Sequence, residues 1–145
     1  MRCLNLQYKK FGDDFILRID RGEEVLHEIK KVCEAENILL GSVQGLGATW
    51  DVSLGVFNHE AFKYESKKFT GDFEIASCSG NISTINGKCY LHIHAVIGNV
   101  TKNEVYAGHL NSAIISLTGE FILHKISGQI DREYSEEIGL NLIKF

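Results

Sequence analysis

The chain has 145 residues, of which 44% are hydrophobic and 23% are charged, and its formal net charge is −4 with neutral histidines. This length and composition predict one globular domain over residues 1–145, large enough to bury about 70% of the surface of its unfolded chain. The acidic balance excludes a protein whose whole surface coats nucleic acid, because neutralising phosphates requires clustered Lys and Arg side chains.

The sequence also gives expectations for the cellular location of the protein and the redox state of its cysteines. No apolar run approaches the roughly 18 residues of a membrane helix, so no membrane partner is expected. The first residues, MRCLNLQYKK, lack the apolar core of a signal peptide, which predicts a cytoplasmic protein. The cysteines show no CxxC or zinc-finger spacing, and we expect them to be reduced and mostly buried: Cys3, Cys33, Cys78 and Cys89.

The first third of the chain predicts two strands followed by a helix. The strands are LNLQYKK and DDFILRID, joined around residues 12–13. Asp20 followed by Glu23 resembles a capping box, which predicts a helix over residues 23–36 that ends at Asn37. One face of this helix is apolar: Val25, Leu26, Ile29, Val32 and Cys33.

From residue 41 onward the pattern is that of strands. GSVQGLGATWDVSLGVFN predicts two strands with a bend near Gly45 and Gly47, and FKYESKKF predicts an exposed edge strand. GDFEIASCSGNISTI and KCYLHIHAVIG flank Asn86-Gly87, the strongest short hairpin signal. AIISLTGEFILHKI predicts a long strand bent at Gly119, and IGLNLIKF is expected to close the sheet. One main helix packed on a mostly antiparallel sheet is an α+β fold.

The hairpin turn sets the register of its two strands, if it is a two-residue loop. Counting back from the turn places Asn81 opposite His92 and Ser79 opposite His94. The predicted apolar face then carries Ala76, Cys78, Ile82, Leu91, Ile93 and Ala95. The opposite face is small and polar, with room for an ion or a ligand: Ser77, Ser79, Asn81, Tyr90, His92 and His94.

These histidines have the spacing of metal ligands. Alternate residues of a strand lie about 6–7 Å apart, so His92 and His94 can converge on one ion at about 2.0–2.1 Å each. The natural third ligand is His109, which follows a polar connection and Gly108, where the backbone can turn. Three neutral imidazoles with an open position suit Zn²⁺ or a similar divalent metal. In the plainer interpretation the histidines only hydrogen-bond to their surroundings, and spacing alone leaves both open.

The remaining candidates near this motif are interpreted as structural. His27, His59 and His124 are expected to be solvated or to make ordinary contacts. By the same register Glu74 falls on the face opposite the histidines and is not a predicted ligand. A bulge between Glu74 and Ser79 would reverse that placement.

The segments GDFEIASCSGNIS, LHIHAVIG, AGHL and SLTGEFIL, in this order, resemble the PPC domain, the "plants and prokaryotes conserved" domain, in its stand-alone prokaryotic form. The resemblance runs from about Phe15 to Leu123, and it departs from the family at Ala107, where glycine is common. It implies an α+β fold with a strongly bent antiparallel sheet, assembled as a homotrimer. It also implies that His92, His94 and His109 form a metal cluster near subunit boundaries.

The resemblance also implies DNA as a partner, because plant relatives carry AT-hooks ahead of the domain. Those hooks use a basic Arg-Gly-Arg-Pro core, which this chain, having no proline, lacks. With the net charge of −4, the DNA interpretation rests on the resemblance alone.

Three functions follow from these expectations. The favoured one is a trimeric PPC-domain module for regulation or assembly, in contact with DNA, with a structural or ligand-sensing metal and no enzymatic role. The alternative is a zinc-dependent enzyme or small-ligand binder at the same histidines, with Glu104 the nearest carboxylate along the chain. A cupin is disfavoured, because the positions that should carry its glutamate are Ile97 and Gly98.

Overall fold

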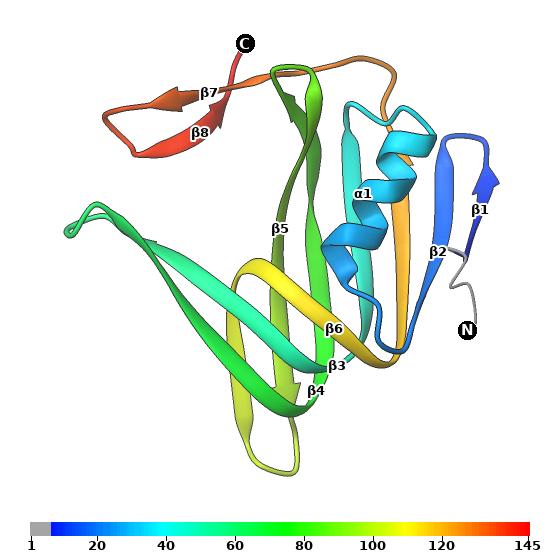
Figure 1. The fold of residues 1–145 in the computed structure, drawn as a ribbon, viewed down its shortest axis with the longest axis vertical. Coiled ribbons are helices and arrows are strands. Elements are labelled where there is room, and N and C mark those ends of the chain that lie inside the picture. The colour runs from blue at the N-terminus through cyan, green and yellow to red at the C-terminus, as the bar shows by residue number, and fades with distance from the viewer. Residues whose placement is uncertain (1–6) are drawn as a thin grey trace.

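The computed structural model describes residues 7–145 (Figure 1). In chain order its elements are β1 (Gln7–Phe11), β2 (Asp14–Asp20), α1 (Val25–Ala35), β3 (Gly41–Asn58), β4 (Lys63–Ile85), β5 (Lys88–Asn99), β6 (Glu104–Lys125), β7 (Arg132–Ser135) and β8 (Leu140–Ile143). The predicted α+β class with a mostly antiparallel, strongly curved sheet is confirmed.

Six strands form one antiparallel sheet in the order β1-β2-β6-β3-β4-β5. β5 also pairs with β6, so β3, β4, β5 and β6 form a closed ring of paired strands. These long strands are strongly curved in Figure 1. β3 is one continuous strand that bends at two register shifts, one of them between Gly45 and Gly47 as predicted. The predicted edge strand is the first part of β4, which pairs only with β3 and is largely exposed.

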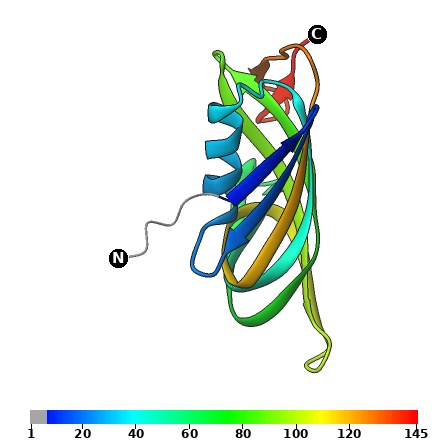
Figure 2. The same ribbon diagram turned by 90° about the vertical axis from the view of Figure 1, so that its right-hand side faces the viewer.

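The helix α1 lies against one side of the sheet (Figure 2). Its apolar face enters a core of buried side chains to which all strands from β2 to β6 contribute. The helix begins two residues later than predicted, because Glu24 is the N-cap and its carboxylate accepts hydrogen bonds from the backbone of Leu26 and His27. Glu23 instead accepts a hydrogen bond from the backbone N–H of Asp20, at 2.7 Å.

The β4–β5 hairpin has the predicted register, with Asn81 opposite His92 and Ser79 opposite His94. Both turn residues take positive φ angles, 52° at Asn86 and 75° at Gly87, as a tight two-residue turn requires.

A bulge interrupts this hairpin between Ile75 and Ser77 and corrects two predictions. Ala76 is exposed and does not belong to the apolar face, because the bulge leaves it without a partner on β5. Glu74 pairs with Gly98, an even number of residues from His94, so it lies on the histidine side of the sheet and not on the opposite side.

The prediction that IGLNLIKF closes the main sheet is wrong. β8 pairs with β7 in a separate two-stranded sheet. This C-terminal hairpin is attached beside the end of β4, where the backbone N–H of Thr84 donates to the carbonyl of Ile130 at 3.0 Å. Its turn approaches the β3–β4 hairpin, where Gly139 packs against Phe57 and Phe62.

The cysteines inside the described residues behave as predicted. Cys33 and Cys78 are buried, Cys89 is half-buried, and all three are free thiols. Cys3 lies outside the described residues.

Candidate metal centre

The three predicted histidines meet at the place where the ring closes. His92 and His94 come from β5, and His109 comes from β6, where it is the direct partner of His94. One ring nitrogen of each residue lies within 4.8 Å of the others. The Nε2 atoms of His92 and His94 are 3.2 Å apart. Strand pairing therefore delivers the third imidazole to the same face as the other two.

Gly108 contributes to this meeting in a way that differs from the prediction. The chain does not turn at Gly108, because β6 continues through it. A Cβ atom at this position would lie 2.8 Å from the carbonyl oxygen of Gly55 on β3. Glycine is thus required for the close approach of β6 to β3, which holds His109 between β3 and β5.

The electrostatic surroundings keep two of the rings neutral. Burial lowers the pKa of His92, and the charges of His109, Arg132 and His94 lower it further. Burial and the neighbouring His94 likewise lower the pKa of His109. Because both pKa values are lowered, His92 and His109 are neutral at neutral pH. Neutral imidazole is the form that binds a metal ion.

A cavity of about 700 Å³ opens beside the histidines. Its walls include the polar side chains of Tyr64, Tyr90 and Asn111, and the apolar side chains of Leu140 and Leu142 on the C-terminal hairpin. The Tyr64 hydroxyl donates to Asn111 at 2.5 Å. The described residues that line the cavity include no Asp or Glu. A metal ion on the histidines would therefore have open positions facing a space of ligand size.

Arg132 is the functional candidate that sequence reasoning missed. It lines the cavity, and its guanidinium lies over the Tyr90 ring, 5.1 Å from the centroid. It donates to Ser83 Oγ at 2.7 Å and to Asn81 Oδ1 at 2.8 Å, which stand opposite Tyr90 and His92 in the β4–β5 pair. About 50 residues separate it from these partners in the chain, so no local pattern indicated the contact.

Several other residues lie outside the site. Glu104 pairs with Asn99 at the far end of the β5–β6 pairing and does not line the cavity. His124 makes an exposed contact with Asp14, with 2.8 Å between Nδ1 and Oδ1. His27 and His59 are exposed. Of the residues that the structure describes, only the three predicted histidines form a group with the geometry of metal ligands.

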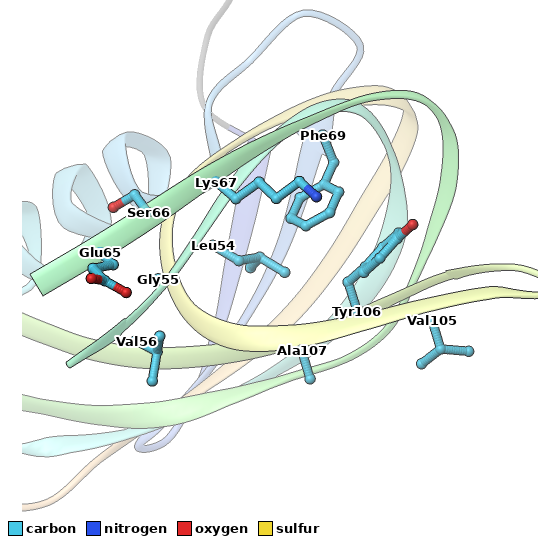
Figure 3. A pocket seen from close by; sticks show the side chains of 10 residues that line it. All are labelled: Leu54, Gly55, Val56, Glu65, Ser66, Lys67, Phe69, Val105, Tyr106 and Ala107. Carbon is cyan, nitrogen blue, oxygen red and sulfur yellow. The ribbon is translucent and has the colours of Figure 1, made fainter. Parts of the chain in front are cut away.

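A second hollow of about 520 Å³ lies between β3, β4 and β6 (Figure 3). Its lining includes Val56, Val105 and the stacked rings of Phe69 and Tyr106, whose centroids are 4.2 Å apart. Glu65, Ser66 and Lys67 also line it, and its lining has no histidine or cysteine, so it offers no cluster of metal ligands.

The model of the Plants and Prokaryotes Conserved (PCC, also written PPC) domain matches residues 6–127. The chain belongs to this family. The family match includes all three histidines and ends before the C-terminal hairpin. No curated protein is similar enough to this chain to match it. No helix within residues 7–145 has the length and apolarity needed to cross a membrane.

Solved structures of other proteins resemble the chain over 97–100% of its length. A protein of Bacteroides thetaiotaomicron described as a "putative DNA binding protein" is 36% identical, with a TM-score of 0.92 and 97% of each chain covered. A "metal-containing protein" of Archaeoglobus fulgidus is 30% identical, with a TM-score of 0.84 and full coverage of both chains. A "plant- and prokaryote-conserved (PPC) protein" of Pyrococcus horikoshii is 26% identical, with a TM-score of 0.82, covering 100% of this chain and 98% of that one.

Proposed function

We propose that this PPC-domain protein is a homotrimeric regulatory module whose His92, His94 and His109 hold a divalent metal, Zn²⁺ or a similar ion. The observation that carries the proposal is the convergence of one nitrogen from each ring within 4.8 Å. The similarity to a metal-containing protein of A. fulgidus supports it. Bound metal would leave at least one coordination position open to the cavity.

The surroundings of the three rings favour metal ligation over a purely structural role. The hydrogen bond recorded for His92 and His94 joins the two rings to each other, so it does not anchor either to the rest of the protein. His109 packs edge-on against Tyr64, with 5.8 Å between ring centroids. Three imidazoles that crowd together without a carboxylate partner gain little as structural residues, whereas a shared cation satisfies all three.

Elemental analysis tests the metal directly. Untagged wild-type protein purified without chelator should carry close to one zinc or similar ion per chain. His94→Ala should lose the ion, because two imidazoles are too few to retain it through purification. His59→Ala removes an exposed histidine outside the cluster and should keep full metal content. Metal-free wild-type protein, even after incubation with Zn²⁺, would refute the metal centre.

DNA contact is part of the same proposal and has different support. It is suggested by the description given to the 36% identical B. thetaiotaomicron protein. The net charge of −4 requires any DNA surface here to be a local one, such as the lysines of β4, Lys63, Lys67 and Lys68. Two of these already pair with carboxylates, Lys63 with Glu65 and Lys68 with Asp51.

A gel shift with duplex DNA at 50 and 200 mM salt should show binding that weakens steeply with salt. No shift at the lower salt would remove DNA from the proposal.

A second candidate function, a metal-dependent small-ligand binder or enzyme, is favoured by one observation. The cavity that opens onto the three histidines is large enough for a small organic molecule and is partly apolar. Its described lining offers no carboxylate to act as a general base, which favours binding over hydrolysis. Both candidate functions use the same ion, so the metal analysis is the first experiment for either.

A further inference from the structure

We propose that the cavity beside the histidines binds a small carboxylic acid, whose carboxylate is held by Arg132 and whose apolar body lies against Leu140 and Leu142. The inference extends the proposed function by naming the ligand class of the metal site. The part that concerns Arg132 rests on contacts within this chain and can be tested without metal.

The first step is the charge of Arg132. Its three recorded hydrogen bonds go to neutral acceptors, the side chains of Ser83 and Asn81 and the carbonyl oxygen of Asn141 at 3.0 Å. None of the ion pairs formed within residues 7–145 includes it. A half-buried guanidinium without a counter-ion is costly, so an anion in the cavity would stabilise it.

The second step is the number of donors that remain. A guanidinium carries five N–H groups, and the three bonds to Ser83, Asn81 and Asn141 leave one N–H on each terminal nitrogen. A carboxylate can accept a charged hydrogen bond from each of them. The same three bonds and the Tyr90 ring fix the guanidinium in place, so little side-chain entropy is lost when a ligand binds.

The third step is position. Arg132 bonds to Asn81, and Asn81 is the direct cross-strand partner of His92. Arg132 and all three histidines line the same cavity. An anion at Arg132 therefore lies beside the metal ligands, where the two positive charges of a bound divalent ion add to its attraction.

The fourth step is the apolar part of the cavity wall. Leu140 and Leu142 of β8, and Val56 and Phe57 of β3, also line the cavity. Inorganic phosphate would leave this apolar surface unused, whereas an organic acid with a short hydrocarbon body covers it. Arg132 and both leucines follow the last residue of the family match, 127. Ligand selectivity is thus assigned to the C-terminal hairpin, and metal binding to the matched domain.

The deciding experiment is calorimetric titration of zinc-loaded, desalted wild-type protein with acetate, butyrate and isovalerate, each compared with its neutral amide. The acids should bind at least tenfold more tightly than the amides, because only the acids accept two charged hydrogen bonds. Affinity should rise by about fourfold for each added carbon that becomes buried. Equal binding of acids and amides, or binding of inorganic phosphate without binding of any of the three acids, would overturn the inference.

Variants assign the effect to Arg132. Arg132→Gln should weaken isovalerate binding at least tenfold while zinc content and circular dichroism stay at wild-type values. Lys144→Gln is the matched control, because it removes a positive charge from beside the same hairpin but outside the cavity, where Lys144 pairs with Glu133. Equal losses in the two variants would make the effect one of net charge and refute the site. If Arg132→Gln fails to fold, the comparison of acids with amides on chelator-treated wild-type protein decides, because no metal ion is then present to coordinate the acids.

The same titrations separate this inference from the proposed metal centre. Wild-type protein that holds zinc but does not distinguish acids from amides would refute the carboxylate site and leave the metal centre standing. Wild-type protein that holds no metal would refute the metal centre. Selective acid binding in that protein, lost in Arg132→Gln, would still support the carboxylate site.

Discussion

At the scale of single residues, the candidate centre depends on how a strand alternates its side chains. His92 and His94 face one way because they are two residues apart, and Ile93 between them is buried in the core. His109 joins them because it is the partner of His94 on β6. Each imidazole is thus oriented by backbone pairing.

The metal-free protein is expected to lose stability in acid because of two of these residues. The pKa values of His92 and His109 are lowered in the folded state from the ordinary value of about 6.5. Below that pH the unfolded chain binds more protons than the folded chain, so the free energy of unfolding falls as the pH drops from about 6.5 through the lowered values. Urea denaturation of chelator-treated protein at pH 8, 6.5 and 5 measures this.

The control for this prediction is the double variant His92→Asn with His109→Gln. It removes both titrating rings, so its stability should depend less on pH over this range than that of the wild type. The same pH dependence in both proteins would contradict the assignment to these histidines.

The sequence allowed the grouping of His92, His94 and His109 to be predicted, but not the rest of the cavity. The turn residues Asn86 and Gly87 fixed the register by counting, and the register placed His92 and His94 on one face. Arg132 could not be predicted in this way, because its contacts with β4 depend on how a separate hairpin folds back. Side chains brought together by tertiary packing leave no periodic signal along the chain.

At the scale of elements, the start of α1 is joined to the sheet by one carboxylate. Glu24 Oε1 accepts from the backbone of Leu26 at 3.1 Å and of Ala113 on β6 at 3.0 Å, and Oε2 accepts from His27 at 2.7 Å. The Glu24 side chain therefore caps the helix and also holds it against β6, the strand that carries His109.

Glu24→Ala is expected to lower the free energy of unfolding by about 1–3 kcal/mol, because it removes a helix cap and leaves the backbone N–H of the buried Ala113 without this partner. Glu34→Ala on the same helix is the control, since Glu34 is exposed and pairs with Lys30 only at 4.0 Å. It should change stability by less than about 0.5 kcal/mol. Urea denaturation at pH 7 compares the two, and equal effects would contradict the role of Glu24.

The bulge and the C-terminal hairpin mark the limits of prediction at this scale. The extra residue between Ile75 and Ser77 interrupts a pattern that reads as regular alternation, so Glu74 was assigned to the wrong side. The apolar residues of β8 resemble a sheet strand in the sequence, and they pair with β7 instead. For the bulge, the partner strand was predicted and only the pairing of Glu74 was missed, whereas for β8 the strand was predicted and its partner was not.

At the scale of the whole molecule, the surface keeps several large apolar side chains in contact with solvent. Val105 is 71% exposed at the rim of the hollow in Figure 3, and Leu117 on the same strand is 70% exposed. Apolar surface of this kind is typical of a subunit interface, which supports the proposed homotrimer.

Val105→Asp is expected to dissociate the proposed trimer, because a charge placed on an apolar interface must be desolvated. Light scattering after size exclusion should show the mass falling from three chains to one. Val100→Asp is the control, because Val100 is 91% exposed in the β5–β6 turn and lies outside the hollow. A wild-type mass of one chain would refute the trimer, and an unchanged mass for Val105→Asp would refute this interface.

The closed ring of β3, β4, β5 and β6 has a seam of six residue pairs, from His94 and His109 to Asn99 and Glu104. An ion bound to both His94 and His109 would link β5 to β6 at one end of this pairing. A shift of the β5–β6 register by one residue would turn His109 away from His92 and His94. The ion could therefore bind all three histidines in only one register. Bound metal would then stabilise only chains with the native β5–β6 register, since chains with a shifted register could not retain the ion.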